Sequence, residues 1–131
     1  MSIVGRRVSL KAIVGMALAM IFAALIPALS GTPSREIVLV AKDMSFYLEG
    51  DPINPNPTLE VKAGERVRVI LRNQDRGMTH NFAVPVLGVE VAPMRWNESD
   101  DLVFDAPDTP GTYEYVCRPH QLMMRGTIRV Y

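Results

Sequence analysis

The stretch "TLEVKAGERVRVILRN" (residues 58–73) carries the clearest fold signal in this chain. Its second half alternates between apolar and cationic side chains, with one set on each face of an extended chain: Val67, Val69 and Leu71 against Arg66, Arg68 and Arg72. A period of two residues is typical of a β-strand with one buried face and one face in water. The first half is also rich in β-formers, and the Ala63-Gly64 pair separates the two runs, so the pattern predicts a β-hairpin.

Other β-prone runs in the chain are short and are separated by Pro, Gly, Asn and Asp. No sustained helical period occurs after residue 30. Residues 44–57 are rich in proline and asparagine and are expected to form a loop or an irregular edge, and a long connection is expected over 85–100. The remaining strands are predicted at 36–42, 80–84, 101–107, 112–117 and 124–131. About seven to eight such strands predict an all-β fold, a Greek-key β-sandwich or barrel.

The first thirty residues have the composition of an export signal. Arg6, Arg7 and Lys11 form a basic head, and an apolar run follows over residues 12–29. This order predicts a signal peptide, with a small-x-small cleavage site, "ALS", ending at residue 30. The sequence "RRVSLK" (6–11) also resembles a twin-arginine export signal, which would imply export of an already folded protein.

A retained membrane anchor is the alternative for this segment, because its apolar run is at the lower edge of the length that spans a bilayer. The predicted organisation is therefore a signal peptide or anchor at 1–30, in the form of a hydrophobic helix, and one folded domain at 31–131. The predicted location is exported, in the periplasm or otherwise outside the cytoplasm. A membrane tether through residues 12–29 would keep the domain at the membrane surface.

Length and charge limit what the folded domain can be. The chain has 131 residues, of which 48% are hydrophobic, enough for one modest core. Without the three cations of the basic head, 11 basic residues stand against 14 acidic ones, so the domain is mildly acidic. A nucleic-acid partner would require a basic face with stacking aromatics, and the sequence has neither.

The segment "YVCRPHQLMMRG" (115–126) contains the one cysteine of the chain. Cys117 cannot form an internal disulfide, and an odd thiol in an oxidising compartment is either a liability or is occupied. Three uses of the segment are open: a soft-metal site, a nucleophile with its base, or ordinary core packing by sulfur-containing side chains. The apolar residues that follow the histidine suit hydrolysis poorly, and a structural zinc site usually has four Cys or His ligands.

The two histidines of the chain favour the metal interpretation. His120 lies three residues after Cys117, and Pro119 stiffens the turn between them. His80 opens a predicted strand that a sandwich could bring alongside. A trigonal His-His-Cys set with a weak axial methionine is the ligand set of blue-copper electron-transfer sites.

These segments resemble the cupredoxin family, the group of plastocyanin, amicyanin and azurin. "GTYEYVCRPHQLMMRGTIRV" looks like the family's copper loop, "MTHNF" like its His-Asn ligand strand, and "PTLEVKAGERVRVILRN" like its early hairpin. The resemblance covers most of residues 36–131 and implies one copper ion held by His80, Cys117, His120 and an axial methionine. That methionine is expected to be Met124, two residues before a glycine, with Met123 as the alternative.

The resemblance also implies functions for residues around the metal. Asn81 is expected to hydrogen-bond across to the cysteine loop and hold it rigid. His120 is expected to be the partly exposed electron port, with Leu122, Met123 and Pro85 as an apolar rim.

The expected function is that of a mononuclear type 1 copper protein, not an enzyme, which cycles between Cu(I) and Cu(II) as a monomer. It would shuttle single electrons between exported partners such as a c-type cytochrome, a terminal oxidase or a nitrogen-oxide reductase. The alternatives are a periplasmic chaperone or scavenger that delivers Cu(I) to an oxidase, and a cupredoxin that has lost its copper and only binds partners.

Overall fold

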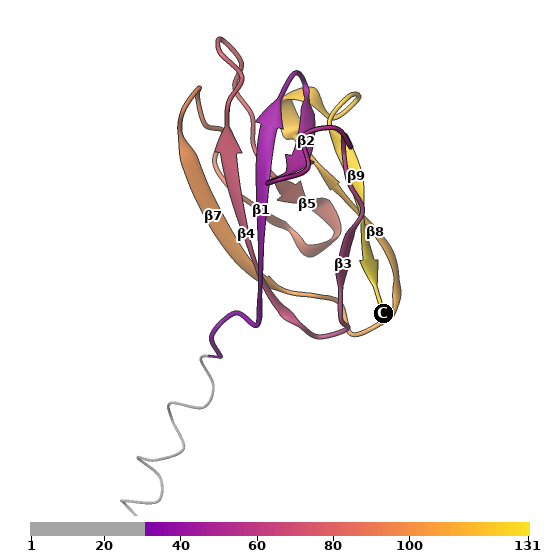
Figure 1. Ribbon diagram of the computed structural model, residues 1–131. Helices are drawn as coiled ribbons and strands as arrows, with labels where there is room; N and C mark the ends of the chain where they lie inside the picture. Colours follow the sequence, from indigo (N-terminus) through magenta and orange to yellow (C-terminus); the bar gives the residue numbers. More distant parts are fainter. Residues whose placement is uncertain (1–30) are drawn as a thin grey trace, which may run out of the picture. The chain divides into compact units, whose positions relative to one another are not determined.

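The structure is a computed structural model that describes residues 31–131, in which nine strands form two sheets (Figure 1). The strands are β1 (Arg35–Lys42), β2 (Ser45–Leu48), β3 (Leu59–Val61), β4 (Arg66–Asn73), β5 (Ala83–Val84), β6 (Val89–Glu90), β7 (Ser99–Asp105), β8 (Gly111–Val116) and β9 (Arg125–Val130). Two short 3-10 helices, η2 (Pro85–Leu87) and η3 (Arg118–His120), accompany them. The all-β prediction is confirmed. The strand count exceeds the predicted seven to eight because β2 lies in the predicted irregular segment and β6, only two residues long, lies in the predicted long connection.

Residues 32–131 form one compact unit, and the predicted signal peptide or anchor lies outside the described residues. Within the described part, no helix has the length and apolar character needed to cross a membrane. The proposed boundary at residue 30 and the nature of the segment before it therefore stay predictions.

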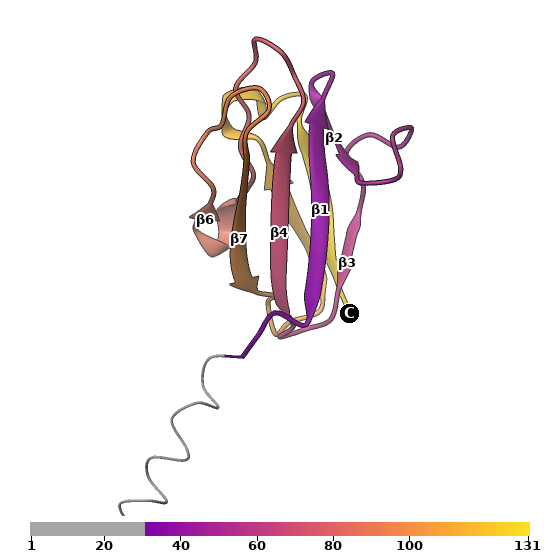
Figure 2. The same ribbon diagram turned by 60° about the vertical axis from the view of Figure 1, so that its left-hand side comes forward.

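The two sheets pack face to face and enclose the core. One sheet has the strand order β2-β1-β4-β7, and the other has the order β3-β9-β8-β5-β6. Figure 2 shows β7, β4 and β1 side by side as one layer, with the second layer behind them. The pairs β1–β4 and β3–β9 are parallel, whereas β4–β7 and β8–β9 are antiparallel.

Strand β4 has the two faces that its sequence predicts. Val67, Val69 and Leu71 are buried, and its arginines lie on the outer face, where they pair with carboxylates of neighbouring strands and of the turn after β2. The predicted hairpin is wrong, however, because β3 and β4 belong to different sheets. The Ala63-Gly64 turn carries the chain from one layer to the other, with Ala63 N–H donating to the Tyr131 carbonyl. Two adjacent β-rich runs pair only if the turn returns the chain within one sheet, and this turn does not.

The strand predicted over 80–84 is shorter than expected. Its paired portion is Ala83–Val84, and His80 takes part instead in an isolated bridge with Met94. Part of the predicted irregular edge over 44–57 forms the edge strand β2, which pairs with β1. The other predicted strands are present, with boundaries that differ by a residue or two at each end.

The core is an aromatic cluster surrounded by aliphatic side chains from both sheets. The Phe46 ring meets Phe82 and Tyr115 edge-on, and Phe82 stacks on Tyr115. The Tyr115 hydroxyl donates to the Pro57 carbonyl at 2.6 Å, which satisfies its polar atom inside the core. Gly126 faces Tyr115 across the β8–β9 ladder, and a Cβ placed on it would lie 2.3 Å from the tyrosine ring.

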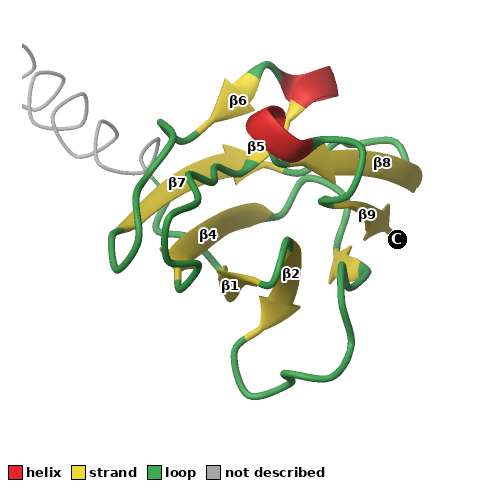
Figure 3. Ribbon diagram, turned by 90° about the horizontal axis from the view of Figure 1, so that it is seen from above, coloured by secondary structure: helices red, strands yellow, loops and turns green. Residues whose placement is uncertain are grey.

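Three loops that are distant in sequence meet at the end of the domain opposite Tyr131. They are the β1–β2 turn, the β4–β5 loop and the β8–β9 loop with η3 (Figures 1 and 3). Hydrogen bonds join them: the β4–β5 loop contacts the β1–β2 turn through Asp75 and the β8–β9 loop through Asn81. This loop end contains the predicted site residues.

Candidate metal centre

Cys117 lies directly after β8, where the chain leaves the sheet and enters η3. Its side chain is fully buried. Its N–H donates to the Met124 carbonyl at 2.9 Å, and its carbonyl accepts from His120 N–H at 3.1 Å. The loop is therefore closed on itself by backbone hydrogen bonds, with Pro119 in its first turn. Such closure fixes the direction of the thiol.

His80 is held beside this thiol by the β4–β5 loop. Its backbone exchanges two hydrogen bonds with Met94, His80 N–H to Met94 O at 3.1 Å and Met94 N–H to His80 O at 2.8 Å. The side chain is fully buried, and its Nδ1 lies 3.7 Å from Cys117 Sγ. The fold thus brings together two predicted ligands that are 37 residues apart in the sequence.

His120 is the third predicted ligand, and its ring lies next to that of His80. It ends η3, and its ring centroid lies 5.0 Å from that of His80 in an edge-to-face arrangement. The side chain is partly exposed. Among residues 31–131, no group of three or more Cys, His, Asp or Glu side chains is arranged closely enough to hold a metal ion. The assembled set is a close His80–Cys117 pair with the His120 ring packed against it.

The two candidate methionines differ sharply in environment. Met124 is fully buried in the core cluster that also contains Cys117, and its N–H donates to the His120 carbonyl at 2.9 Å. Met123 is 60% exposed. A thioether that ligates a buried thiolate-bound metal has to lie on the inner side of the loop, which favours Met124.

Asn81 joins the two loops that carry the predicted ligands. Its side-chain oxygen accepts from Arg118 N–H at 2.7 Å, and its own N–H points to Cys117 Sγ at 3.5 Å. Its amide nitrogen donates to the Val91 carbonyl, so the buried side chain has partners on both sides. The cross-loop contact expected of this residue is present, and it restrains the cysteine loop against the His80 strand.

Asp75 was not among the predicted site residues, although it lies in a polar turn five residues before His80. In the structure its Oδ2 lies 2.8 Å from His80 Nε2. It also accepts hydrogen bonds from the backbone N–H groups of Asp43 and Met44. A carboxylate a few residues before a candidate ligand histidine is the signal that could have identified it.

Burial and hydrogen bonds set the charges of this site. Burial lowers the pKa of His80, with Asp75 acting in the opposite direction, so the imidazole is neutral at neutral pH. Burial by itself raises the pKa of Asp75, but hydrogen bonds from Met44, Asp43 and His80 outweigh it, and the net shift is downward. Burial raises the pKa of the Cys117 thiol, against hydrogen bonds from Asn81 and His120. A cation that binds here therefore has to displace the thiol proton.

The donor set suits copper and not the hard cations magnesium and calcium. A buried thiol, neutral imidazole nitrogen and a buried thioether are soft to intermediate donors, whereas magnesium and calcium require oxygen ligands. His80 offers Nδ1 toward the thiol because its Nε2 faces the carboxylate of Asp75.

A depression of about 400 Å³ lies beside His120, lined among others by Met44, Pro119 and Leu122. Leu122 is 89% exposed, so the loop presents apolar surface next to the partly exposed imidazole. Pro85, which was expected in this rim, begins η2 and does not line the depression.

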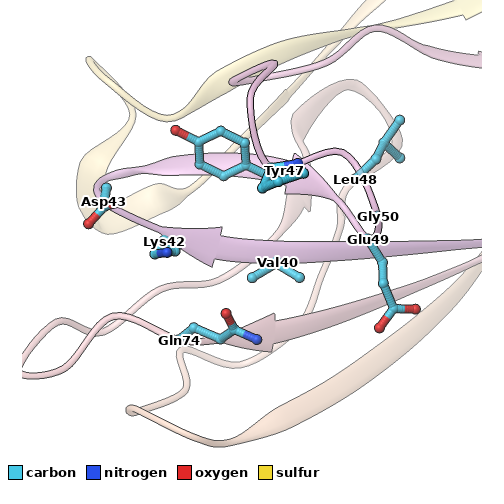
Figure 4. Close-up of a pocket in the computed structure, with 9 residues that line it drawn as sticks. Val40, Lys42, Asp43, Tyr47, Leu48, Glu49, Gly50 and Gln74 are labelled. Atoms are coloured by element: carbon cyan, nitrogen blue, oxygen red, sulfur yellow. The ribbon is translucent and has the colours of Figure 1, made fainter.

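A second depression, of about 300 Å³, lies on the outer face of β1 and β2 (Figure 4). Its lining includes Val40, Lys42, Tyr47 and Glu49, which come from these two strands and the turn that follows β2. None of the predicted metal ligands lines it. Its side chains do not converge on a common point in Figure 4, and it has no thiol or imidazole.

Comparison with known proteins agrees with the fold. Residues 14–130 match the family model of the cupredoxin-like domain. No curated protein matches the sequence. Among solved structures, auracyanin B superposes with a TM-score of 0.62 at 23% identity, over 79% of this chain and 93% of that one. Rusticyanin from Thiobacillus ferrooxidans superposes with a TM-score of 0.58 at 24% identity, over 87% and 94% of the two chains.

A reduced amicyanin variant superposes with a TM-score of 0.52 at 27% identity, over 79% of this chain and 88% of that one. The family model matches most of the chain, and the two-sheet architecture is consistent with it. The chain belongs to the cupredoxin-like family.

Proposed function

We propose that this protein is a mononuclear type 1 copper protein that carries single electrons between exported redox partners. The observation that carries the proposal is the buried pair of His80 Nδ1 and Cys117 Sγ, 3.7 Å apart and clamped by Asn81. A structural histidine or a packing cysteine would not require this pairing inside an apolar core. Family membership agrees with it, and an amicyanin variant matched at 26% identity was solved in its Cu(I) form.

The proposed ligands are His80, Cys117 and His120, with Met124 as the axial thioether. Bound copper would supply a one-electron Cu(II)/Cu(I) couple. The protein residues supply a rigid pocket, because Cys117, His80 and Met124 are fully buried and Asn81 hydrogen-bonds the two loops that carry them. A pocket that does not rearrange between the two charge states keeps the barrier to electron transfer low.

His120 is the proposed electron port. It is the partly exposed member of the set, and Leu122 and Met123 surround it with exposed apolar surface. Small apolar contacts are typical of brief redox encounters, in which a partner docks and leaves quickly. The mildly acidic domain would steer a partner of opposite charge. A c-type cytochrome, a terminal oxidase or a nitrogen-oxide reductase fits this description.

The proposed location is outside the cytoplasm. The basic and apolar composition of residues 1–30 supports export, either through a cleaved signal peptide or with a retained anchor.

The test is the visible spectrum of the full-length chain after addition of Cu(II). We expect an intense blue thiolate-to-copper band that ascorbate bleaches and an oxidant restores. Cys117→Ser should abolish the band, while Met123→Leu, a change at an exposed sulfur, should keep it. A protein that stays colourless with Cu(II) would contradict the proposal.

Delivery of Cu(I) to an oxidase is the second candidate. Exposed thioethers favour it, since Met78 and Met123 are 44% and 60% exposed on the loops that carry the predicted ligands. The buried thiol at the centre of the site argues against it, because a delivery site has to release its metal to a partner. A colourless protein that binds Cu(I) tightly and passes it to a chelator would support this candidate.

A further inference from the structure

Asp75 lies behind His80 and is nearly as buried as the histidine. Its Oδ2 is 2.8 Å from His80 Nε2, and the exposed fractions of the two side chains are 14% and 0%. The contact is on the opposite side of the imidazole from Cys117, whose Sγ faces Nδ1. One imidazole therefore bridges a carboxylate and a thiol.

The carboxylate is fixed before it meets the imidazole. Asp43 N–H donates to Oδ1 at 2.8 Å, and Met44 N–H donates to Oδ2 at 3.0 Å. The backbone of Asp75 is restrained as well, because its N–H donates to the Asn73 side chain at 2.8 Å. Asn73 is itself buried and donates to the carbonyls of Met78 and Met94. Met94 is also the β-bridge partner of His80.

This geometry selects one form of the imidazole. An ionised carboxylate can only accept hydrogen bonds, so His80 Nε2 has to carry the proton. The lone pair then lies on Nδ1, on the side of Cys117. Rotation of the ring by half a turn would separate Nε2–H from Asp75 and leave a buried donor without its charged acceptor, which is costly.

We propose that Asp75 is the positioning residue of the metal centre: it holds His80 in the tautomer and orientation that ligate copper, and it lowers the reduction potential of the site. The inference rests on the proposed function. A carboxylate on the outer nitrogen of a ligand imidazole raises the basicity of the ligand. A more basic ligand and a nearby negative charge both favour the higher charge state of the metal, so the oxidised form gains more than the reduced form.

Asp75→Asn is the test variant, and Asp43→Asn is its matched control. Both remove one negative charge from the same loop end, but no contact of the Asp43 side chain with His80 is present, and Asn tolerates the positive φ of residue 43. Asp75→Asn should raise the reduction potential by about 59 mV or more, a tenfold shift toward the reduced form for one electron. Asp43→Asn should shift it by less than half as much.

The second readout is nitrogen NMR of the metal-free, full-length protein at neutral pH. The Nε2–H tautomer of His80 should exceed the Nδ1–H tautomer by at least about tenfold, as expected for a hydrogen bond to a charged acceptor. Asp75→Asn should reduce this excess, and Asp43→Asn should not. If Asp75→Asn does not fold, the tautomer of the unmodified protein decides the question, because a predominant Nδ1–H form would overturn the proposal.

The two proposals fail in different ways. A colourless protein with His80 in the Nε2–H form would contradict the copper function and support the positioning by Asp75. A blue protein whose potential is unchanged by Asp75→Asn would leave the copper function intact and overturn the effect of Asp75 on the potential. Equal shifts in the two variants would overturn positioning as the cause, since charge alone would then explain them.

Discussion

Two shielded carboxylates lie at opposite ends of β4, and each is hydrogen-bonded to at least one backbone N–H group and to one imidazole or guanidinium side chain. Glu65 precedes the strand and accepts from Lys62 N–H and from the Arg35 guanidinium, both at 2.9 Å. Asp75 follows the strand and accepts from the backbone after β1 and from His80. Each carboxylate thus joins one end of β1 to one end of β4, the parallel pair at the centre of its sheet.

The difference lies in the side chain that each carboxylate contacts, Arg35 or His80. Arg35 is a permanent cation that extends toward solvent, so the Glu65 end is a structural clasp with its charge neutralised locally. His80 is neutral and buried, so the Asp75 end keeps a negative charge that is directed at a candidate ligand. A hydrogen-bonded carboxylate therefore stabilises the fold at one end of β4, and at the other end it is expected to lower the reduction potential of the metal site.

Glycine substitutions at the two ends should have the largest effect. Gly126→Ala would place a Cβ 2.3 Å from the ring of Tyr115, a side chain fixed in the core, and should cost about 3 kcal/mol of unfolding free energy. Gly64→Ala meets only the tip of the Asp108 side chain, at 3.1 Å, but has a φ of +70°. It should cost about 1–2 kcal/mol. Denaturant unfolding measures both, and a larger loss for Gly64→Ala would contradict the assignment of Tyr115 as a rigid neighbour.

Glu65→Gln should separate stability from redox behaviour. The variant loses the charged hydrogen bond to Arg35 and should cost about 1–2 kcal/mol of unfolding free energy. It should leave the reduction potential unchanged, because no candidate ligand contacts Glu65. The measurements are denaturant unfolding of the metal-free protein and redox titration of the copper-loaded one. A potential shift as large as that of Asp75→Asn would remove the distinction between the two ends.

Substitutions of the two loop methionines change the candidate metal site without changing the Glu65 end of β4. Met124→Leu should raise the reduction potential by about 59 mV or more, since the axial thioether stabilises the oxidised form. The two side chains are similar in volume, so the core should tolerate the change. Met123→Leu is the control, because this exposed side chain should leave the potential unchanged. The opposite result in a redox titration would assign the axial position to Met123.

Acid should lower the free energy of unfolding of the metal-free protein in two steps. Burial lowers the pKa of His80 below its usual 6.5, so below that pH the unfolded chain takes up a proton that the folded chain does not, and stability falls. Glu65 and Asp75 also have lowered pKa values, since their hydrogen bonds outweigh burial, which acts in the opposite direction. Their contributions are complete above 4.5 and 3.8, the usual pKa values of the two groups, and are lost as the pH falls below them.

Glu65→Gln separates these steps. It should flatten the loss of stability below about pH 4.5, while the loss that begins near 6.5 stays. Unfolding midpoints measured across the acid range check this. If Glu65→Gln also removed the loss of stability that begins near pH 6.5, the assignment of that loss to His80 alone would be wrong.

The sequence predicted the strand at 66–73 and the loop from Cys117 to His120 because each is encoded by neighbouring residues. The alternation of Val67, Val69 and Leu71 with arginines has the period of a strand, whatever lies around it. The Cys-x-x-His spacing likewise brings two candidate ligands into one turn. The presence of just two histidines in the chain pointed to His80, and family resemblance added Asn81. No local spacing connects either residue to that turn.

The sequence did not predict the pairing partners. Adjacent residues 59–61 and 66–73 look like a hairpin but enter different sheets, because strand pairing depends on which distant segments close the core. The Asp75–His80 contact was missed for a related reason. Its geometry depends on the β1–β2 turn, whose amides orient the carboxylate from more than thirty residues away.

Local sequence therefore determined most of the strands of this domain, since a strand pattern follows from consecutive residues. Sheet membership, the burial of Met124 against the exposure of Met123, and the partner of His80 arise only when distant segments pack together. The two adjacent methionines have the same chemistry in the sequence. They differ in the folded protein because the loop buries Met124 and exposes Met123.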